Sequence, residues 1–212
     1  MAKTATETKK LVTIPRPNIQ GLSLAIKGIE PYVQLRFSEK AKAQMHEKQA
    51  AGSTAGKGKQ RKPKDFKGAY EAAMYRSDGH YGIPASAFRA AMVSACRLCG
   101  FKMTLAKMSL FVEADGWDAQ DGTPLVFITK GKPEYYESPM RNANGGVDLR
   151  VRARWAPGWE AKVRVSYDAG QFTETDVVNL FMRVGLQVGV GEGRPDSRKS
   201  CGCGYGRFSI LE

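Results

Sequence analysis

Apolar and polar residues alternate in several parts of the chain, which predicts β-strands there. Residues 22–37 alternate with an interruption at residues 28–31, so we expect one long, half-buried strand with a bulge. Residues 108–114 and 125–129 alternate on either side of a turn-rich segment and predict a hairpin with a long loop. Residues 207–211 predict a short final strand.

The clearest alternation lies at residues 147–167, on either side of Pro157 and Gly158. It predicts a hairpin with one apolar face and one basic face. Like charges on neighbouring strands repel each other, so the basic face requires solvent, acids or a phosphate backbone beside it. The cations of this face are Arg150, Arg152, Arg154, Lys162 and Arg164.

Two segments carry apolar residues at helical spacing. One begins at Pro84 and is closed by Gly100; the other begins at the cap-like Thr173 and runs to Gly185. The resulting order is strand, helix, strands, helix, loop and strand. It predicts an α+β fold in which helices cover one face of an antiparallel sheet, as in ferredoxin-like or RRM-like domains.

The composition divides the chain into an arm, a domain and an insertion. Residues 1–20 are polar and contain two prolines, so we expect an irregular N-terminal arm before a domain at residues 21–212. Residues 45–67 are rich in Ala, Gly, Gln, Ser and Lys and predict a mobile basic insertion. It either clamps a nucleic-acid strand, reaches a neighbouring subunit, or serves only as a solubilising loop. Its cations are Lys57, Lys59, Arg61, Lys62, Lys64 and Lys67.

The charge balance indicates an anionic partner. The 212 residues carry a formal net charge of +12, and the sequence pI is near 9.6. Nucleic acid fits this charge better than an anionic membrane does. Because the sequence shows no signal peptide and no run of about 18 apolar residues, we expect a cytoplasmic protein of a bacterial or archaeal cell, or of a phage.

Two glycine clusters near the C-terminus bracket a basic stretch, which is the composition of a phosphate-binding loop. The segment lacks the G-x-x-x-x-G-K-[ST] motif and follows a helical segment, so a nucleic-acid backbone suits it better than a mononucleotide. The alternative is a flexible surface loop whose charges are solvated. The candidate binding residues are Gly189, Gly191, Gly193, Arg194, Arg198, Lys199, Gly204, Tyr205, Gly206 and Arg207.

Four cysteines form a C-x-x-C and a C-x-C pair. Together, Cys96, Cys99, Cys201 and Cys203 have the donor set of a structural zinc site, with buried or loop thiols as the alternative. We expect no other cofactor.

Two segments resemble the repeat-associated mysterious protein (RAMP) superfamily. Residues 83–91, Ile-Pro-Ala-Ser-Ala-Phe-Arg-Ala-Ala, are similar to its I-P-G-S-S-L-K-G-A-L-R segment, and residues 189–208 are similar to its C-terminal glycine-rich loop, which ends in G-x-G-R-F. The resemblance implies RNA binding, as a CRISPR-complex subunit that coats guide RNA or as a guide-RNA-processing nuclease. It also implies that Ser86 and Arg89 lie near the loop.

Catalysis has little support in the sequence. His46 and His80 lack a paired base or orienting group, and Asp65 lies in a lysine-rich setting, so we assign no catalytic residue. We expect a sequence-independent protein that coats single-stranded RNA or DNA as a helical oligomer, with or without CRISPR-type partner subunits. The alternatives are an endoribonuclease and an assembly protein without nucleic acid. Tyr205 is the best base-stacking candidate, whereas Trp155 and Trp159 are either stacking or core residues.

Overall fold

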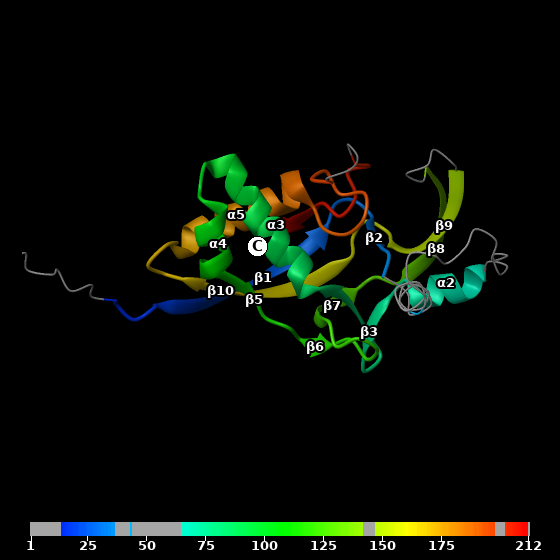
Figure 1. The fold of residues 1–212 in the computed structure, drawn as a ribbon, viewed down its shortest axis with the longest axis horizontal. Coiled ribbons are helices and arrows are strands. Elements are labelled where there is room, and N and C mark those ends of the chain that lie inside the picture. The colour runs from blue at the N-terminus through cyan, green and yellow to red at the C-terminus, as the bar shows by residue number, and fades with distance from the viewer. Residues whose placement is uncertain (1–13, 37–42, 44–64, 142–146, 198–201, 212) are drawn as a thin grey trace, which may run out of the picture.

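The computed structural model describes residues 14–36, 43, 65–141, 147–197 and 202–211 (Figure 1). This part of the chain is an α+β protein with a large antiparallel sheet, as predicted, and it contains four α-helices, two more than predicted. The helices are α2 (Phe66–Ala72), α3 (Ala85–Ala95), α4 (Met103–Ser109) and α5 (Glu174–Arg183). The strands are β1 (Ile19–Gly28), β2 (Tyr32–Gln34), β3 (Tyr75–Ser77), β4 (His80–Pro84), β5 (Leu110–Val112), β6 (Gly116–Trp117), β7 (Pro124–Lys130), β8 (Pro133–Arg141), β9 (Val147–Trp155), β10 (Glu160–Asp168) and β11 (Phe208–Ile210).

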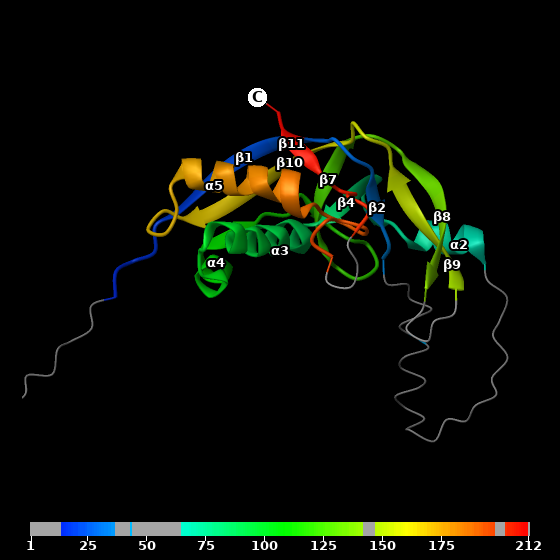
Figure 2. The ribbon, with the colours of Figure 1, turned by 90° about the horizontal axis from the view of Figure 1, so that it is seen from above.

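The strands form two sheets. The large sheet has the order β11-β1-β10-β7-β4-β3, with β5 also paired to β10 and β6 paired to β7. The small sheet has the order β2-β9-β8 and lies at one end of the molecule beside α2 (Figure 2). The chain enters the small sheet twice, once through β2 and once through the β8–β9 hairpin.

Helices α3 and α5 run side by side along one face of the large sheet (Figure 2). Their apolar faces meet in the core, where Phe88 of α3, Phe181 of α5 and Phe208 of β11 are all fully buried. The Phe88 and Phe181 ring centroids are 6.1 Å apart, and those of Phe181 and Phe208 are 5.4 Å apart. Aromatic burial of this size is a major part of core stability.

Both predicted helices are confirmed, and local chemistry explains their ends. The Thr173 side chain accepts a hydrogen bond from the Asp176 N–H, and the Asp176 side chain accepts one from the Thr173 N–H, which is a complete capping box at the start of α5. After α3, a 3₁₀ turn ends at Gly100, whose φ of 69° is left-handed. The predicted terminal strand is confirmed as β11.

A second aromatic cluster joins the two sheets. The Tyr32 ring centroid lies 5.3 Å from that of Trp155 and 5.6 Å from that of Trp159, and all three side chains are buried. The Trp159 indole N–H donates to the Glu30 carbonyl at 3.0 Å. Trp155 and Trp159 are therefore core residues.

The predicted hairpin at residues 147–167 is wrong. Strand β9 pairs with β8 and β2, whereas β10 pairs with β1, β5 and β7. The chain passes from the small sheet to the large one at residues 156–159. Alternation identifies a strand and its buried face, but it does not identify the neighbouring strand.

Two further strand predictions need correction for the same reason. Residues 22–37 do not form one bulged strand, because β1 pairs in the large sheet and β2 in the small one. Residues 108–114 and 125–129 do not pair with each other: Met108 belongs to α4, β5 pairs with β10, and the hairpin partner of β7 is β6.

The predicted arm and insertion lie mostly outside the described residues. The arm ends earlier than expected, since Ile19 and Gln20 already belong to β1. The insertion also ends earlier, because Asp65 caps α2 by accepting a hydrogen bond from the Gly68 N–H, and the exposed Lys67 lies within that helix. No helix in the described part of the chain is long and apolar enough to span a membrane.

Candidate nucleic-acid interface

The glycine-rich loop, residues 189–207, connects a π-helical turn after α5 to β11. Backbone hydrogen bonds fold it onto itself: the Val190 N–H donates to the Gly206 carbonyl at 3.0 Å, and the Cys203 N–H donates to the Gly193 carbonyl at 2.7 Å. Others attach it to the segment around β2, where the Glu192 N–H donates to the Val33 carbonyl at 2.9 Å. The described part of the loop is therefore a packed structure.

The loop glycines serve this packing. Gly191 has a φ of +81°, and a Cβ there would lie 2.6 Å from the Tyr32 ring and 2.6 Å from the Val33 carbonyl oxygen. Gly206 has a φ of +70°, and a Cβ there would lie 1.7 Å from the Val190 carbonyl oxygen. The positive φ and the lack of space for a Cβ both require glycine at these two positions. Several loop amides expected to face a phosphate instead donate within the protein, namely those of Gly189, Val190, Glu192, Cys203, Tyr205 and Gly206.

An open groove of about 900 Å³ separates α3 from the glycine-rich loop. The helix contributes Ser86 and Arg89, and the loop contributes Gly191 and Arg194, so two segments about a hundred residues apart in sequence meet there. Lys107 of α4 also lines the groove. The pairing of the helix start with the loop, which the sequence resemblance implied, is present in the structure.

The cations of this groove have defined positions. The Arg89 Nε donates to the Leu110 carbonyl at 2.9 Å, and its guanidinium lies over the Phe111 ring, 5.1 Å from the centroid. The Arg194 guanidinium donates to the Gly191 carbonyl at 3.0 Å. Neither of these hydrogen bonds is to a carboxylate, and the exposed Lys107 adds a third cation to the groove.

Asp196 fastens the loop to the last turn of α3. Its carboxylate accepts hydrogen bonds from the Ser94 hydroxyl and from Arg97, the latter at 2.7 Å. The hydrogen bond from Ser94, with help from Arg97, lowers the pKa of Asp196. Asp196 also lines the groove, and the charge of Arg194 contributes to lowering its pKa, so this carboxylate offsets part of the positive charge there.

Arg152 of β9 contacts the loop, and both Arg152 and Arg154 are paired with acids. Arg152 is 3% exposed and forms an ion pair with Glu192 of the loop, and it also donates to the Ser138 hydroxyl at 2.8 Å. Arg154 pairs with Glu134 at 3.0 Å. Arg150 is half-buried. Arg152 therefore serves to hold the loop against the small sheet.

Lys162 and Arg164 lie on β10, in the other sheet, so the five predicted cations do not share a face. The Arg164 guanidinium is 3.0 Å from Asp115 and 3.8 Å from Glu113. Lys162 is exposed on the sheet face opposite the helices, because its neighbours Ala161 and Val163 are buried.

Other predicted site residues have mixed surroundings. Tyr205 is packed against Tyr136, with the two hydroxyls 3.4 Å apart, and the hydrogen bond with Tyr136 together with burial raises the pKa of Tyr205 to about 12. Arg207 pairs with Glu30 at 2.9 Å. The residues that lie outside the described part of the chain are Lys57, Lys59, Arg61, Lys62, Lys64, Arg198, Lys199 and Cys201.

The described residues hold no cluster of three or more side chains suited to a metal ion. Cys96 is buried, and burial raises the pKa of its thiol, whereas Cys99 and Cys203 are exposed. His80 stacks on Phe127, with ring centroids 4.8 Å apart and planes 7° apart. His46 lies outside the described residues.

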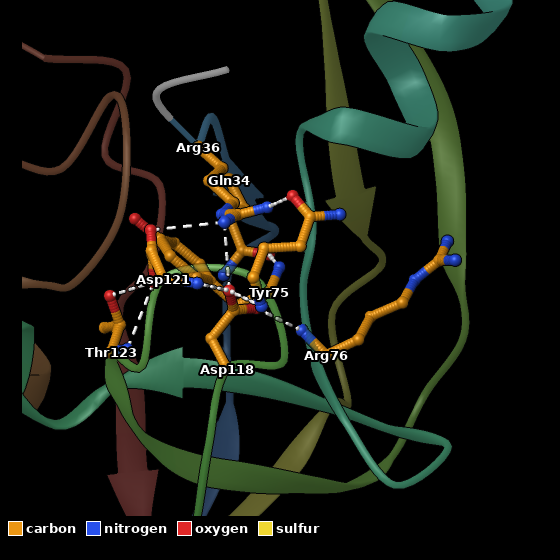
Figure 3. A network of polar contacts seen from close by, with 8 residues as sticks. Gln34, Arg36, Tyr75, Arg76, Asp118, Asp121 and Thr123 are labelled. Atoms are coloured by element: carbon orange, nitrogen blue, oxygen red, sulfur yellow. Dashed lines mark hydrogen bonds and ion pairs between the residues drawn. The ribbon is translucent and has the colours of Figure 1, made fainter. Parts of the chain in front are cut away.

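A buried polar network was not foreseen from the sequence (Figure 3). The Arg36 guanidinium lies 3.0 Å from Asp118 and 3.2 Å from Asp121, at the end of the strand-like run that begins with β2. Burial alone would raise the pKa of Asp121, but hydrogen bonds from Thr123 and Arg36 outweigh it and lower the pKa below its ordinary value. The only signal in the sequence is a turn with two aspartates, which is ordinary turn composition.

No protein-family model and no curated protein matches this chain.

Proposed function

We propose that this chain binds single-stranded nucleic acid without regard to sequence, does not cleave it, and coats the strand as an oligomer. The groove between α3 and the glycine-rich loop is the proposed binding site. We further propose that the chain is a RAMP-like protein, either a guide-RNA-coating subunit of a CRISPR-type complex or a strand-coating protein of a phage.

The observation that carries the proposal is the convergence of two cationic segments on one groove. Ser86 and Arg89 line it from one side and Gly191 and Arg194 from the other. Residues of these types hold phosphates through charge and hydrogen bonds and carry little base information. Such a site suits binding that does not depend on sequence.

The start of α3 adds a further attraction for phosphate. Pro84 occupies the N-cap position, and no side chain caps the 11-residue helix. The first N–H groups of a helix have no partner within it and carry a partial positive charge, which favours an anion. Ser86 and Ala87, both in this first turn, line the groove.

The topology supports a RAMP-like domain. Strands β11, β1, β10 and β5 are neighbours in that order, α3 lies between β1 and β5 in sequence, and α5 lies between β10 and β11. A ferredoxin-like fold joins two split β-α-β units in the same way. On this proposal, β3, β4, β6, β7 and the small sheet are additions to a ferredoxin-like centre.

A charge comparison tests the site. The double variant Lys107→Ala, Arg194→Ala should raise the Kd for labelled 20-nucleotide oligo-U or oligo-dT at least tenfold. The slope of log K against log salt should become shallower by about 1.4, since each contacted phosphate contributes about 0.7 for a single strand. Lys27→Ala is the control, because Lys27 is exposed on the opposite sheet face, paired in register with Glu160. An equal loss in the control, or no loss in the double variant, would contradict the proposed site.

Purification without nuclease tests the partner. Co-purifying RNA of defined length would favour a guide-coating role, and DNA or mixed lengths would favour general strand coating. Preference for oligo-U over oligo-dT would indicate contacts to the 2′-hydroxyl. RNA cleavage that His80→Ala abolishes would instead support an endoribonuclease, and absence of binding to either strand would refute the proposal.

A further inference from the structure

Strand β1 forms part of the rim of the large sheet, and only its last residues have a neighbour on the outer side (Figure 2). On the inner side, β10 pairs with β1 from Ile19 to Lys27. On the outer side, β11 pairs with Ile26–Gly28 alone. Among the residues that the structure describes, no strand lies beside the outer edge of residues 19–24.

The hydrogen-bond pattern identifies which backbone groups face outward. The Leu211 N–H, on the β11 side, donates to the Ala25 carbonyl at 2.8 Å, and the Ala169 N–H, on the β10 side, donates to the Asn18 carbonyl at 2.7 Å. Because backbone groups alternate in direction along an antiparallel strand, Ile19, Gly21 and Ser23 direct their N–H and C=O groups outward. All three residues are exposed.

This edge lacks the devices that protect other sheet edges of the protein. Edge strand β8 carries Pro133 and Pro139 as well as two exposed acids, and edge strand β3 is only three residues long. Residues 19–24, Ile-Gln-Gly-Leu-Ser-Leu, contain neither proline nor charge. Soluble proteins usually blunt an exposed edge of this kind, so an unprotected edge indicates a partner strand.

The sequence just before β1 contains a segment suited to pairing as a strand. Residues 11–14, Leu-Val-Thr-Ile, are rich in β-branched and apolar residues. Pro15 and Pro17 follow them and favour extended backbone. Residues 14–17 lead away from the sheet, and Ile14 is 85% exposed (Figure 2).

We propose that residues 11–14 of one copy add as a strand to the outer edge of β1 in a second copy. The eight-residue step from residue 11 to residue 19 spans up to about 26 Å when extended, which is enough to reach a neighbouring subunit. The main-chain hydrogen bonds of such an added strand supply affinity, and alternate side chains supply specificity. Each copy has one arm and one edge, so arms passed on in one direction build a row of subunits, whereas two copies that exchange arms form a closed dimer.

The test measures particle mass after nuclease treatment and high-salt washing, so that nucleic acid does not bridge subunits. Wild-type protein should form species larger than a monomer as its concentration rises in sedimentation-velocity runs. Deletion of residues 1–14 should give a monomer. Ser23→Pro should do the same, because proline removes an outward N–H without breaking the bonds of β1 to β10. Ser23→Thr keeps that N–H and should oligomerise as wild type does, and thermal melts followed by circular dichroism check that each variant is folded.

A peptide experiment identifies the occupant. A labelled peptide of residues 8–16 should bind the chain that lacks residues 1–14, whereas a scrambled peptide should not bind it. Ser23→Pro in the same shortened chain should reduce peptide binding at least tenfold. Wild-type protein that stays monomeric, or peptide binding that Ser23→Pro leaves unchanged, would overturn the proposal. The inference does not depend on nucleic-acid binding: the shortened chain should still bind a short oligonucleotide if the proposed groove is correct.

Discussion

Gly191 and Gly204 share a left-handed backbone conformation but not the same surroundings. Their φ angles are +81° and +78°. A Cβ on Gly191 would meet Tyr32 and Val33 at 2.6 Å, whereas a Cβ on Gly204 would meet only the Arg207 Nε, at 3.9 Å. Gly204→Ala should therefore lower the free energy of unfolding by about 1 kcal/mol through backbone strain alone. Gly191→Ala should lower it by a further 1 to 3 kcal/mol or so, because the new atom overlaps packed neighbours.

Urea denaturation of the two variants measures this difference. Equal losses would mean that the loop moves away from Tyr32 without penalty, and the packed loop described above would then be incorrect. The comparison separates the cost of backbone strain from the cost of overlap with packed neighbours. The glycine content of the sequence alone does not distinguish these two costs.

Arg36 offers a second comparison, between a buried and an exposed ion pair. The Arg36 and Asp118 side chains are 1% and 2% exposed, whereas the Arg76 and Glu71 side chains are 44% and 50% exposed. Arg36→Met should lower the free energy of unfolding by about 3 to 5 kcal/mol, because it leaves two carboxylates without their cation, one of them buried. Arg76→Met should lower it by less than about 1 kcal/mol. Chemical denaturation at pH 7 tests both predictions. A loss below about 1 kcal/mol for Arg36→Met would show that the ion pairs of Arg36 drawn in Figure 3 do not form in solution.

The attachment of the glycine-rich loop to α3 should depend on pH. The hydrogen bond from Ser94 lowers the pKa of Asp196, so the ionised carboxylate stabilises the folded state. That stabilisation is complete above the ordinary pKa of aspartate, about 3.9, and is lost as the pH falls through the lower pKa of the folded protein. Asp196→Asn should therefore be less stable than wild type at pH 7, and the two should converge toward pH 2.

Ser94→Ala is the matched variant for this prediction. It removes the first cause of the lowered pKa while leaving Arg97 in place. Its stability relative to wild type should show the same sign of pH dependence with a smaller amplitude. A difference between wild type and Asp196→Asn that stays constant from pH 7 to pH 2 would contradict a lowered pKa.

Helices α3 and α5 were predictable because their signals are local. Apolar spacing, the capping box at Thr173 and the left-handed Gly100 all lie within a few residues of each helix. Strand partners were not predictable in this way. Strands β9 and β10 are consecutive and both alternate, yet Trp155 and Trp159 pack at the junction where the chain changes sheets. The alternation of apolar and polar residues does not show that the chain passes from one sheet to the other at this junction.

The candidate site also combines residues that local sequence patterns predict with residues that they miss. Ser86, Arg89, Gly191 and Arg194 were predicted and meet at one groove. Lys107 was missed, because the apolar run at residue 108 indicates a strand and conceals helix α4. Arg152 lies in a strand, as predicted, but its partner Glu192 is 40 residues away and was not foreseen. Burial by a distant loop makes Arg152 part of an internal ion pair, where the sequence predicts a ligand contact.

The chain carries many more cations than the few that line the described groove. The groove presents Arg89, Lys107 and Arg194, while the chain carries 33 Lys and Arg residues against 21 acids. Several other cations, including Arg152, Arg154, Arg164 and Arg207, are paired with acids. Residues 52–64 contain five cations and no acid, so they are the largest local excess of charge.

Replacing the five cations of residues 52–64 with glutamine should therefore weaken nucleic-acid binding without changing stability. If the segment binds phosphates, the slope of log K against log salt should become shallower by about 0.7 for each phosphate that the variant no longer neutralises. The affinity should fall to the same degree for oligo-U and for mixed sequences, because phosphate binding carries no base information. A variant with the five cations intact but residues 45–51 replaced by glycine and serine is the control for segment composition. An unchanged slope together with unchanged affinity would mean that these cations only face solvent, and the groove would then have to account for nucleic-acid binding without them.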